Sequence, residues 1–167
     1  MNTSTRGCRA ARRPVVQPFP MAALVTSDRR HWFDAPPAVL WDRMAAVGEY
    51  RRWWPWLRSF DADALRSGEV WACVVQPPLP YRLGFDLALD EVVPRQAVRA
   101  TLSGDIVGTA ALEISALEGG SELHLVSALA PGSRTLEAVS AIARPVARIG
   151  HDWVLATGIR QFRARAL

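Results

Sequence analysis

Residues 81–93 read YRLGFDLALDEVV and carry an apolar side chain at every second position of their first half. In a β-strand successive side chains point to opposite faces, so this period of two predicts a half-buried strand. Arg82 and Asp86 then face away from the interior. The inward face of the predicted strand carries Tyr81, Leu83, Phe85, Leu87 and Leu89.

The same alternation extends in both directions, from Leu57 to Leu129. Turn residues at 67–68, 103–105 and 119–120 divide this region into short segments. Antiparallel strands joined by short connections form a meander, which we expect here. The inward positions include Val98, Ala100, Leu102, Ile106, Gly108, Ala110, Leu112, Ile114, Leu123 and Leu125, and Arg99 points outward with Arg82.

Helices are predicted on both sides of the meander. After a strand over 24–33, Pro37 suits a first helical position, and Gly48 ends the helix. A second short turn covers 49–54. At the other end, a long helix follows Ser133 and reaches Arg165, with a kink expected at Pro145. The small residues on one stripe of this helix indicate close approach to another surface, or room for a bound ligand.

Composition narrows the class of protein. The 167 residues carry a formal net charge of +4, and all 20 basic residues are arginine. The first 27 residues hold four arginines and no acid, whereas 16 arginines face 16 acids from Asp28 onward. We therefore expect a disordered basic tail over 1–22, with a translation start at Met1 or Met21, and one folded domain over 23–167. The balanced domain argues against nucleic acid as a partner.

Other classes are disfavoured by missing patterns. No apolar run approaches the roughly 18 residues of a membrane helix, so we expect no stable membrane insertion. Two cysteines and three scattered histidines give no metal-ligand spacing, and we expect no metal and a cytoplasmic location. GxGxxG, P-loop and GxSxG motifs are absent from the sequence, and no cofactor is expected.

Four stretches resemble the polyketide cyclase/dehydrase group of the START-like (SRPBCC) superfamily, in particular its uncharacterised actinobacterial members. They are FDAPPAVLWDRMAAVGEYRRWWPWL at 33–57, LPYRLGFDLAL at 79–89, GDIVGTAALEI at 104–114 and GHDWVLATGIRQF at 150–162. The order of elements is that of the α+β helix-grip fold. The resemblance implies a curved antiparallel sheet of about six or seven strands around a long C-terminal helix, with two short helices after the first strand.

The resemblance implies a cavity between sheet and helix that binds an apolar small molecule. Indole rings offer a broad apolar face and one donor, so the tryptophans are candidates for its wall or, alternatively, for sealing one end of the core. Gly108 could mark a bulge or leave space for ligand. The candidate ligand-binding residues are Trp53, Trp56, Trp71, Leu83, Phe85, Leu87, Leu102, Gly108, Val154 and Gly158.

His151 is the candidate catalytic residue, because an imidazole on the small-residue stripe could exchange a proton with a bound carbonyl or enol. The alternative is a buried histidine that has found a hydrogen-bond partner. Asp152 points about 100° away around the helix, so no relay between these neighbours is expected.

Three functions remain open at this point. The first is binding of a lipid, polyketide or isoprenoid-like molecule. The second is an enzyme that cyclises or dehydrates a polyketide-like substrate, and the third is a protein interaction module that uses the outer sheet or the cluster Trp53, Trp54 and Trp56. The protein is expected to be a monomer or a homodimer.

Overall fold

The computed structural model describes residues 25–78, 81–132 and 134–167, the last range with side chains from Arg148 onward. The expected tail over 1–22 and Ser133, which precedes the expected long helix, lie outside the described residues, as does the whole of 1–24. In chain order the elements are β1 (Val25–Phe33), α1 (Pro37–Ala45), a 3₁₀ turn (Val47–Glu49), α2 (Tyr50–Trp53), β2 (Leu57–Asp61), β3 (Val70–Val75), β4 (Leu83–Val93), β5 (Ala97–Gly104), β6 (Ile106–Leu117), β7 (Gly120–Pro131) and α3 (Arg134–Arg165).

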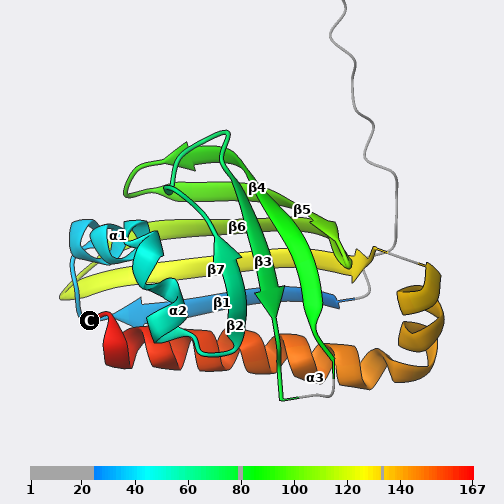
Figure 1. Ribbon diagram of the computed structural model, residues 1–167. Helices are drawn as coiled ribbons and strands as arrows, with labels where there is room; N and C mark the ends of the chain where they lie inside the picture. Colours follow the sequence, from blue (N-terminus) through cyan, green and yellow to red (C-terminus); the bar gives the residue numbers. More distant parts are fainter. Residues whose placement is uncertain (1–24, 79–80, 133) are drawn as a thin grey trace, which may run out of the picture.

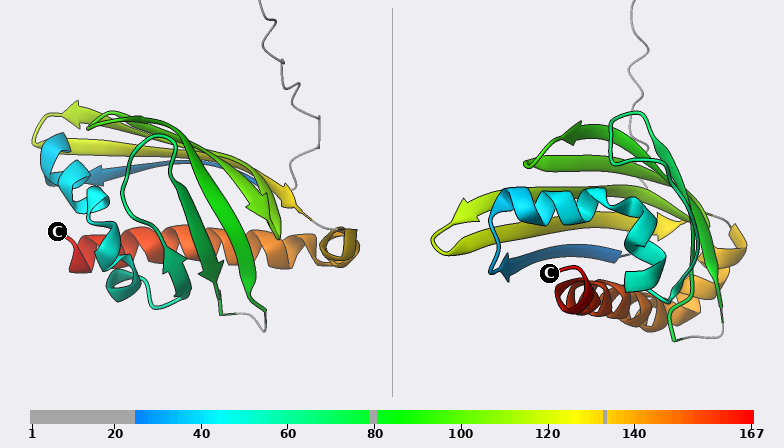
Figure 2. Two further views of the ribbon diagram at one scale, coloured as in Figure 1. Left: turned by 45° about the horizontal axis from the view of Figure 1, so that its top comes forward. Right: turned by 60° about the vertical axis from the view of Figure 1, so that its left-hand side comes forward.

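The strands form one antiparallel sheet in the order β1-β7-β6-β5-β4-β3-β2. The sheet curls, and α3 lies along its open side, as both views of Figure 2 show. The expected α+β helix-grip architecture, with two short helices after the first strand, is confirmed.

Strand register confirms which side chains share the inner face. Leu87 is paired with Leu102, Leu102 with Gly108, and Gly108 with Leu129, so one row of inward positions crosses β4 to β7. Arg99 is exposed on the opposite face, where it pairs with Glu91. The period-two pattern therefore predicted the two faces of these strands.

The first helix forms where the sequence predicts it. Pro36 has an extended backbone, and Pro37 occupies the first turn, where its missing N–H leaves no hydrogen bond unmade. Leu40, Trp41 and Met44 recur at helical spacing and are buried. These side chains hold α1 against the core.

Hydrogen bonds join α3 to the rest of the fold along its described length. Its carboxylate Asp152 accepts a hydrogen bond of 2.7 Å from Arg29 of β1. Farther along, Arg165 donates to the carbonyl of Trp53 at 2.7 Å, at the end of α2. α3 also bends in its first part, gold to orange in Figure 1, in line with the kink expected within this helix.

A group of aromatic rings packs together where α2 meets the C-terminal half of α3. The ring of Phe162 packs edge-on against Phe33 and Trp53, with centroid distances of 6.0 and 5.6 Å. The ring of Tyr50 stacks on Phe60 at 5.2 Å. We call this region the aromatic end; its buried rings are Phe33, Trp41, Tyr50, Trp53, Trp71 and Phe162.

Candidate functional site

The inner face of the sheet is not buried uniformly. Several aliphatic and aromatic side chains point toward the side of the sheet on which α3 lies but remain only half-buried. Interiors are packed nearly as densely as organic crystals, so half-buried apolar side chains on an inner face indicate space that the protein does not fill. We call this set the inner patch; it consists of Leu83, Phe85, Leu87, Val98, Leu112 and Leu125.

Backbone contacts explain why the patch is uncovered. The backbone of α3 approaches β1 and β7 on one side and α2 on the other. The patch residues lie mainly on β4, β5 and β6, between those two lines of contact. The backbone contacts of the described part of α3 are therefore concentrated at β1 and β7 and at α2.

The structure places three of the predicted ligand residues in this patch and two of the predicted tryptophans in the core. Leu83, Phe85 and Leu87 belong to the inner patch. Trp53 and Trp71 are each only 6% exposed, and the indole N–H of Trp71 donates to the carbonyl of Ala64 at 3.0 Å. These two tryptophans seal the aromatic end, which is the alternative that the sequence left open for them.

Leu102, Val154 and the two glycines complete the predicted set. Leu102 is buried and Val154 is half-buried. Gly108 has φ +144, and a Cβ there would lie 2.0 Å from the carbonyl oxygen of Ala128. A backbone requirement therefore explains Gly108. Gly158 lies beside the rings of Trp56 and Trp54, and its carbonyl accepts a hydrogen bond from the indole N–H of Trp54; a Cβ there would lie 3.5 Å from Trp56, which is an ordinary contact.

Trp56 lies apart from the sealed tryptophans and lines an open groove of about 480 Å³. The groove is bounded by the start of β2, the residues after β3, and α3. Its walls include the rings of Trp56 and Trp153, whose centroids are 6.4 Å apart. The other lining residues are Pro55, Arg58, Gln76, Pro77, Pro78 and Gln161.

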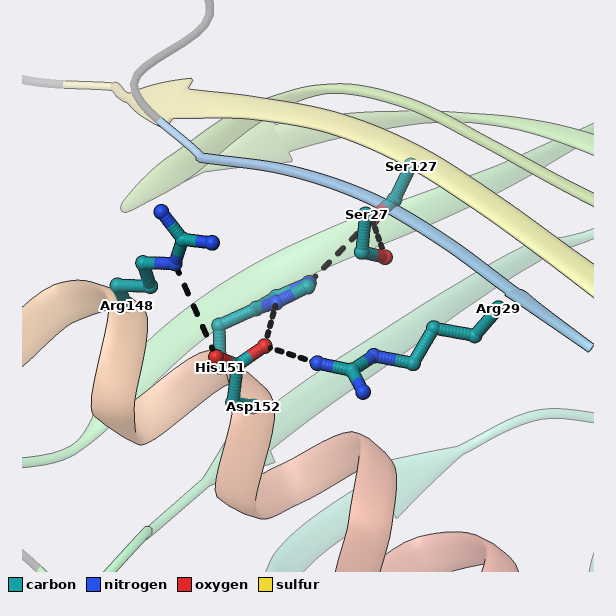
Figure 3. Close-up of polar contacts among 6 residues, drawn as sticks. All are labelled: Ser27, Arg29, Ser127, Arg148, His151 and Asp152. Carbon is teal, nitrogen blue, oxygen red and sulfur yellow. Dashed lines mark hydrogen bonds and ion pairs between the residues drawn. The ribbon is translucent and has the colours of Figure 1, made fainter.

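His151 faces the inner side of β7, as Figure 3 shows. Its Nε2 lies 3.3 Å from the hydroxyl of Ser127, which in turn lies 3.0 Å from the hydroxyl of Ser27. Its Nδ1 is buried, has no hydrogen-bond partner among the described residues, and lies 4.0 Å from a carboxylate oxygen of Asp152. That oxygen instead accepts from Arg29, so the expected lack of a relay between His151 and Asp152 agrees with the geometry.

The surroundings of His151 favour the neutral form of its imidazole. Burial lowers its pKa below the ordinary 6.5; the carboxylate of Asp152 opposes this shift, and Arg29 adds to it. A neutral imidazole could accept a proton, but one nitrogen contacts Ser127 and the other is closed off from solvent. In this arrangement His151 links α3 to β7.

His31 on β1 has similar surroundings. Within the part of the chain that the structure describes, its buried Nε2 has no hydrogen-bond partner, and burial, Arg163 and Arg29 all lower its pKa. The register pairs His31 with Leu123 of the inner face. Two histidines that favour the neutral form thus stand on the side of the sheet that faces α3.

Several residues of the groove were not predicted as site residues from the sequence; they include Arg58, Gln76, Trp153 and Gln161. Arg82, which donates a hydrogen bond to Gln76, was predicted only to point outward. They come from β2, the residues after β3, the start of β4 and α3, so spacing along the chain gives no sign that they meet. The pair Pro77-Pro78 interrupts the strand pattern and is a local signal in the sequence of a connection between two strands.

Comparisons with known proteins bear on the fold. No family model matches the sequence, and no curated protein matches it. Solved structures do match. The protein CV1439 from Chromobacterium violaceum is 18% identical with a TM-score of 0.57, covering 84% of this chain and 96% of that one. TTHA0849 from Thermus thermophilus is 10% identical with a TM-score of 0.62, covering 86% and 100%. Ara h 8.0201 is 14% identical with a TM-score of 0.53, covering 66% and 79%.

At these identities the likeness concerns the fold. The curled seven-stranded sheet, its strand order and the terminal helix define the chain as a helix-grip protein. Within the described ranges, no helix combines the length and the apolar character that crossing a membrane requires.

Proposed function

We propose that this protein binds a hydrophobic small molecule between the sheet and α3. The observation that carries the proposal is the inner patch, whose apolar side chains face the side on which α3 lies yet remain half-buried. Pockets for small molecules are largely apolar with a few polar groups, and the inner patch with the open groove has that composition. A lipid, polyketide or isoprenoid-like ligand fits this description, in a protein that works in the cytoplasm.

Two alternatives have less support. An enzyme of the polyketide cyclase/dehydrase type would need a ring nitrogen of His151 that reaches the substrate as acid or base. In the structure Nε2 contacts the hydroxyl of Ser127, and Nδ1 is buried. For a protein interaction module, the cluster Trp53, Trp54 and Trp56 would have to face solvent, whereas Trp53 is buried and the other two are half-buried.

The test is a calorimetric titration with dodecan-1-ol, an uncharged apolar probe. Val98→Trp places a large ring in the inner patch, and we expect it to abolish binding. Arg99→Trp adds the same ring at the next residue, on the outer face, and should leave the affinity unchanged. Equal affinities of the wild type and Val98→Trp would contradict the proposal, as would a wild type that binds no apolar probe.

A further inference from the structure

Two arginines converge on one oxygen atom at the rim of the groove. The Nε of Arg58 donates to Oε1 of Gln76 at 3.0 Å, and the Nε of Arg82 donates to the same oxygen at 3.3 Å. Both side chains are exposed. In the described part of the chain, neither guanidinium forms an ion pair with a carboxylate.

This arrangement holds two positive charges close together around a neutral amide. Like charges at such separations repel, and an anion placed between them would relieve the repulsion. Guanidinium groups bind carboxylates through charge-assisted hydrogen bonds, and each arginine has further N–H groups to donate. The rim of the groove is therefore complementary to a single negative charge.

The walls of the same groove are apolar. Trp56 and Trp153 contribute indole rings, and the indole N–H of Trp56 is already donated to Gln161 at 3.0 Å. Pro77 adds a buried ring. The tryptophan and proline surfaces suit hydrocarbon, whereas the arginine pair suits a charge.

The groove also adjoins the inner face. Gln76 directly follows Val75, and Arg82 directly precedes Leu83, and these two apolar residues are paired in the sheet. Leu83 belongs to the inner patch. A ligand with its charged end at Gln76 and Arg82 would thus have apolar protein surface on the inner side of the same strands.

We propose that Arg58 and Arg82 bind the carboxylate of an amphipathic ligand whose apolar body lies against Trp56 and Trp153. The inference rests on the proposed function, because it names the chemical class of the ligand and the end of the site that recognises its charge. The proposed ligand binds as one molecule and carries one negatively charged group.

The test compares dodecanoate with dodecan-1-ol, which share a chain length and differ in charge. Both are titrated below the concentrations at which they form aggregates. In Arg58→Gln/Arg82→Gln the affinity for dodecanoate should fall roughly tenfold, as expected for two partly solvent-screened charged hydrogen bonds. The affinity for dodecan-1-ol should not change. Arg43→Gln removes one exposed charge on α1 and should alter neither affinity.

A second measurement needs no variant. Added salt screens the exposed arginines, so it should weaken binding of dodecanoate to the wild type and not that of dodecan-1-ol. An unchanged dodecanoate affinity in the double variant would overturn the inference, and so would an equal loss for both probes. If the wild type binds neither probe, the proposed function itself fails, whereas equal binding of both probes by all variants overturns only the role of the arginines.

Discussion

The aromatic end and the inner patch lie in the same domain but are packed differently. At the aromatic end, rings from β1, α2 and α3 meet edge to face, and Phe33 is 2% exposed. In the inner patch, Phe85 and Leu112 face the same side of the sheet and remain half-buried. The difference indicates that the aromatic end stabilises the fold and leaves the middle of the sheet free for a ligand.

The largest expected effect is on the free energy of unfolding when one phenylalanine in each region is replaced by alanine. Phe162→Ala removes a ring that is 4% exposed and contacts Phe33, Trp53 and Trp54, so the free energy of unfolding should fall by about 3 to 5 kcal/mol. Phe85→Ala removes the same ring from the inner patch and should cost about half as much or less. Urea unfolding followed by circular dichroism measures both. Equal losses would mean that Phe85 is as fully packed as Phe162.

Replacing each of the two glycines in the candidate site by alanine is expected to change the stability of the protein in opposite directions. Gly108→Ala forces a side chain into a backbone with φ +144, against the carbonyl of Ala128, and should destabilise the protein by about 1 to 3 kcal/mol. Gly158→Ala meets Trp56 at 3.5 Å, an ordinary contact, and alanine favours the helix by up to about 1 kcal/mol. Thermal unfolding of the two variants gives the comparison. A stable Gly108→Ala protein would show that the site tolerates a side chain there.

A smaller effect concerns pH at the junction of β1, β7 and α3. The folded pKa values of His31 and His151 lie below the ordinary 6.5, so the unfolded chain takes up protons first as the pH falls. Stability should be full above pH 6.5 and should decrease from there toward the folded pKa values. Between about pH 5 and 6.5, where carboxylates stay mostly ionised, a melting-temperature profile isolates this contribution.

The matched control for the histidine effect is a double variant. His31→Gln/His151→Gln removes both imidazoles and should flatten the profile in that pH range. A double variant that loses stability as steeply as the wild type on acidification would assign the pH dependence to other groups.

The sequence predicted the fold because each local pattern agrees with the global arrangement. Alternation in 81–93 identified the inner face of β4, and Pro37 marked the start of the first helix. The expected end at Gly48 was wrong, because α1 ends at Ala45 and Gly48 lies in the 3₁₀ turn that follows. Signals between neighbours along the chain therefore placed these elements but not every boundary.

The candidate site was only partly predictable, because it depends on contacts between segments that are far apart in the sequence. Leu83, Phe85 and Leu87 were identified by period, but how completely each is buried depends on where α3 lies across the sheet. Trp71 shares their face and is nevertheless sealed. The convergence of Arg58 and Arg82 on Gln76 joins three separate segments, and no spacing rule anticipates it.

The central claim, that the inner patch borders unfilled space, is tested most directly by adding volume. Leu112 and Ile114 lie two residues apart on β6 and face the same side, but Ile114 is 7% exposed and Leu112 is half-buried. The measurement is the free energy of unfolding of Leu112→Trp and Ile114→Trp. We predict a loss of about 1 to 3 kcal/mol or more for Ile114→Trp, from overpacking, and less than about 1 kcal/mol for Leu112→Trp. An equally large loss for Leu112→Trp would show that the protein's own side chains already fill this space, and would contradict the account.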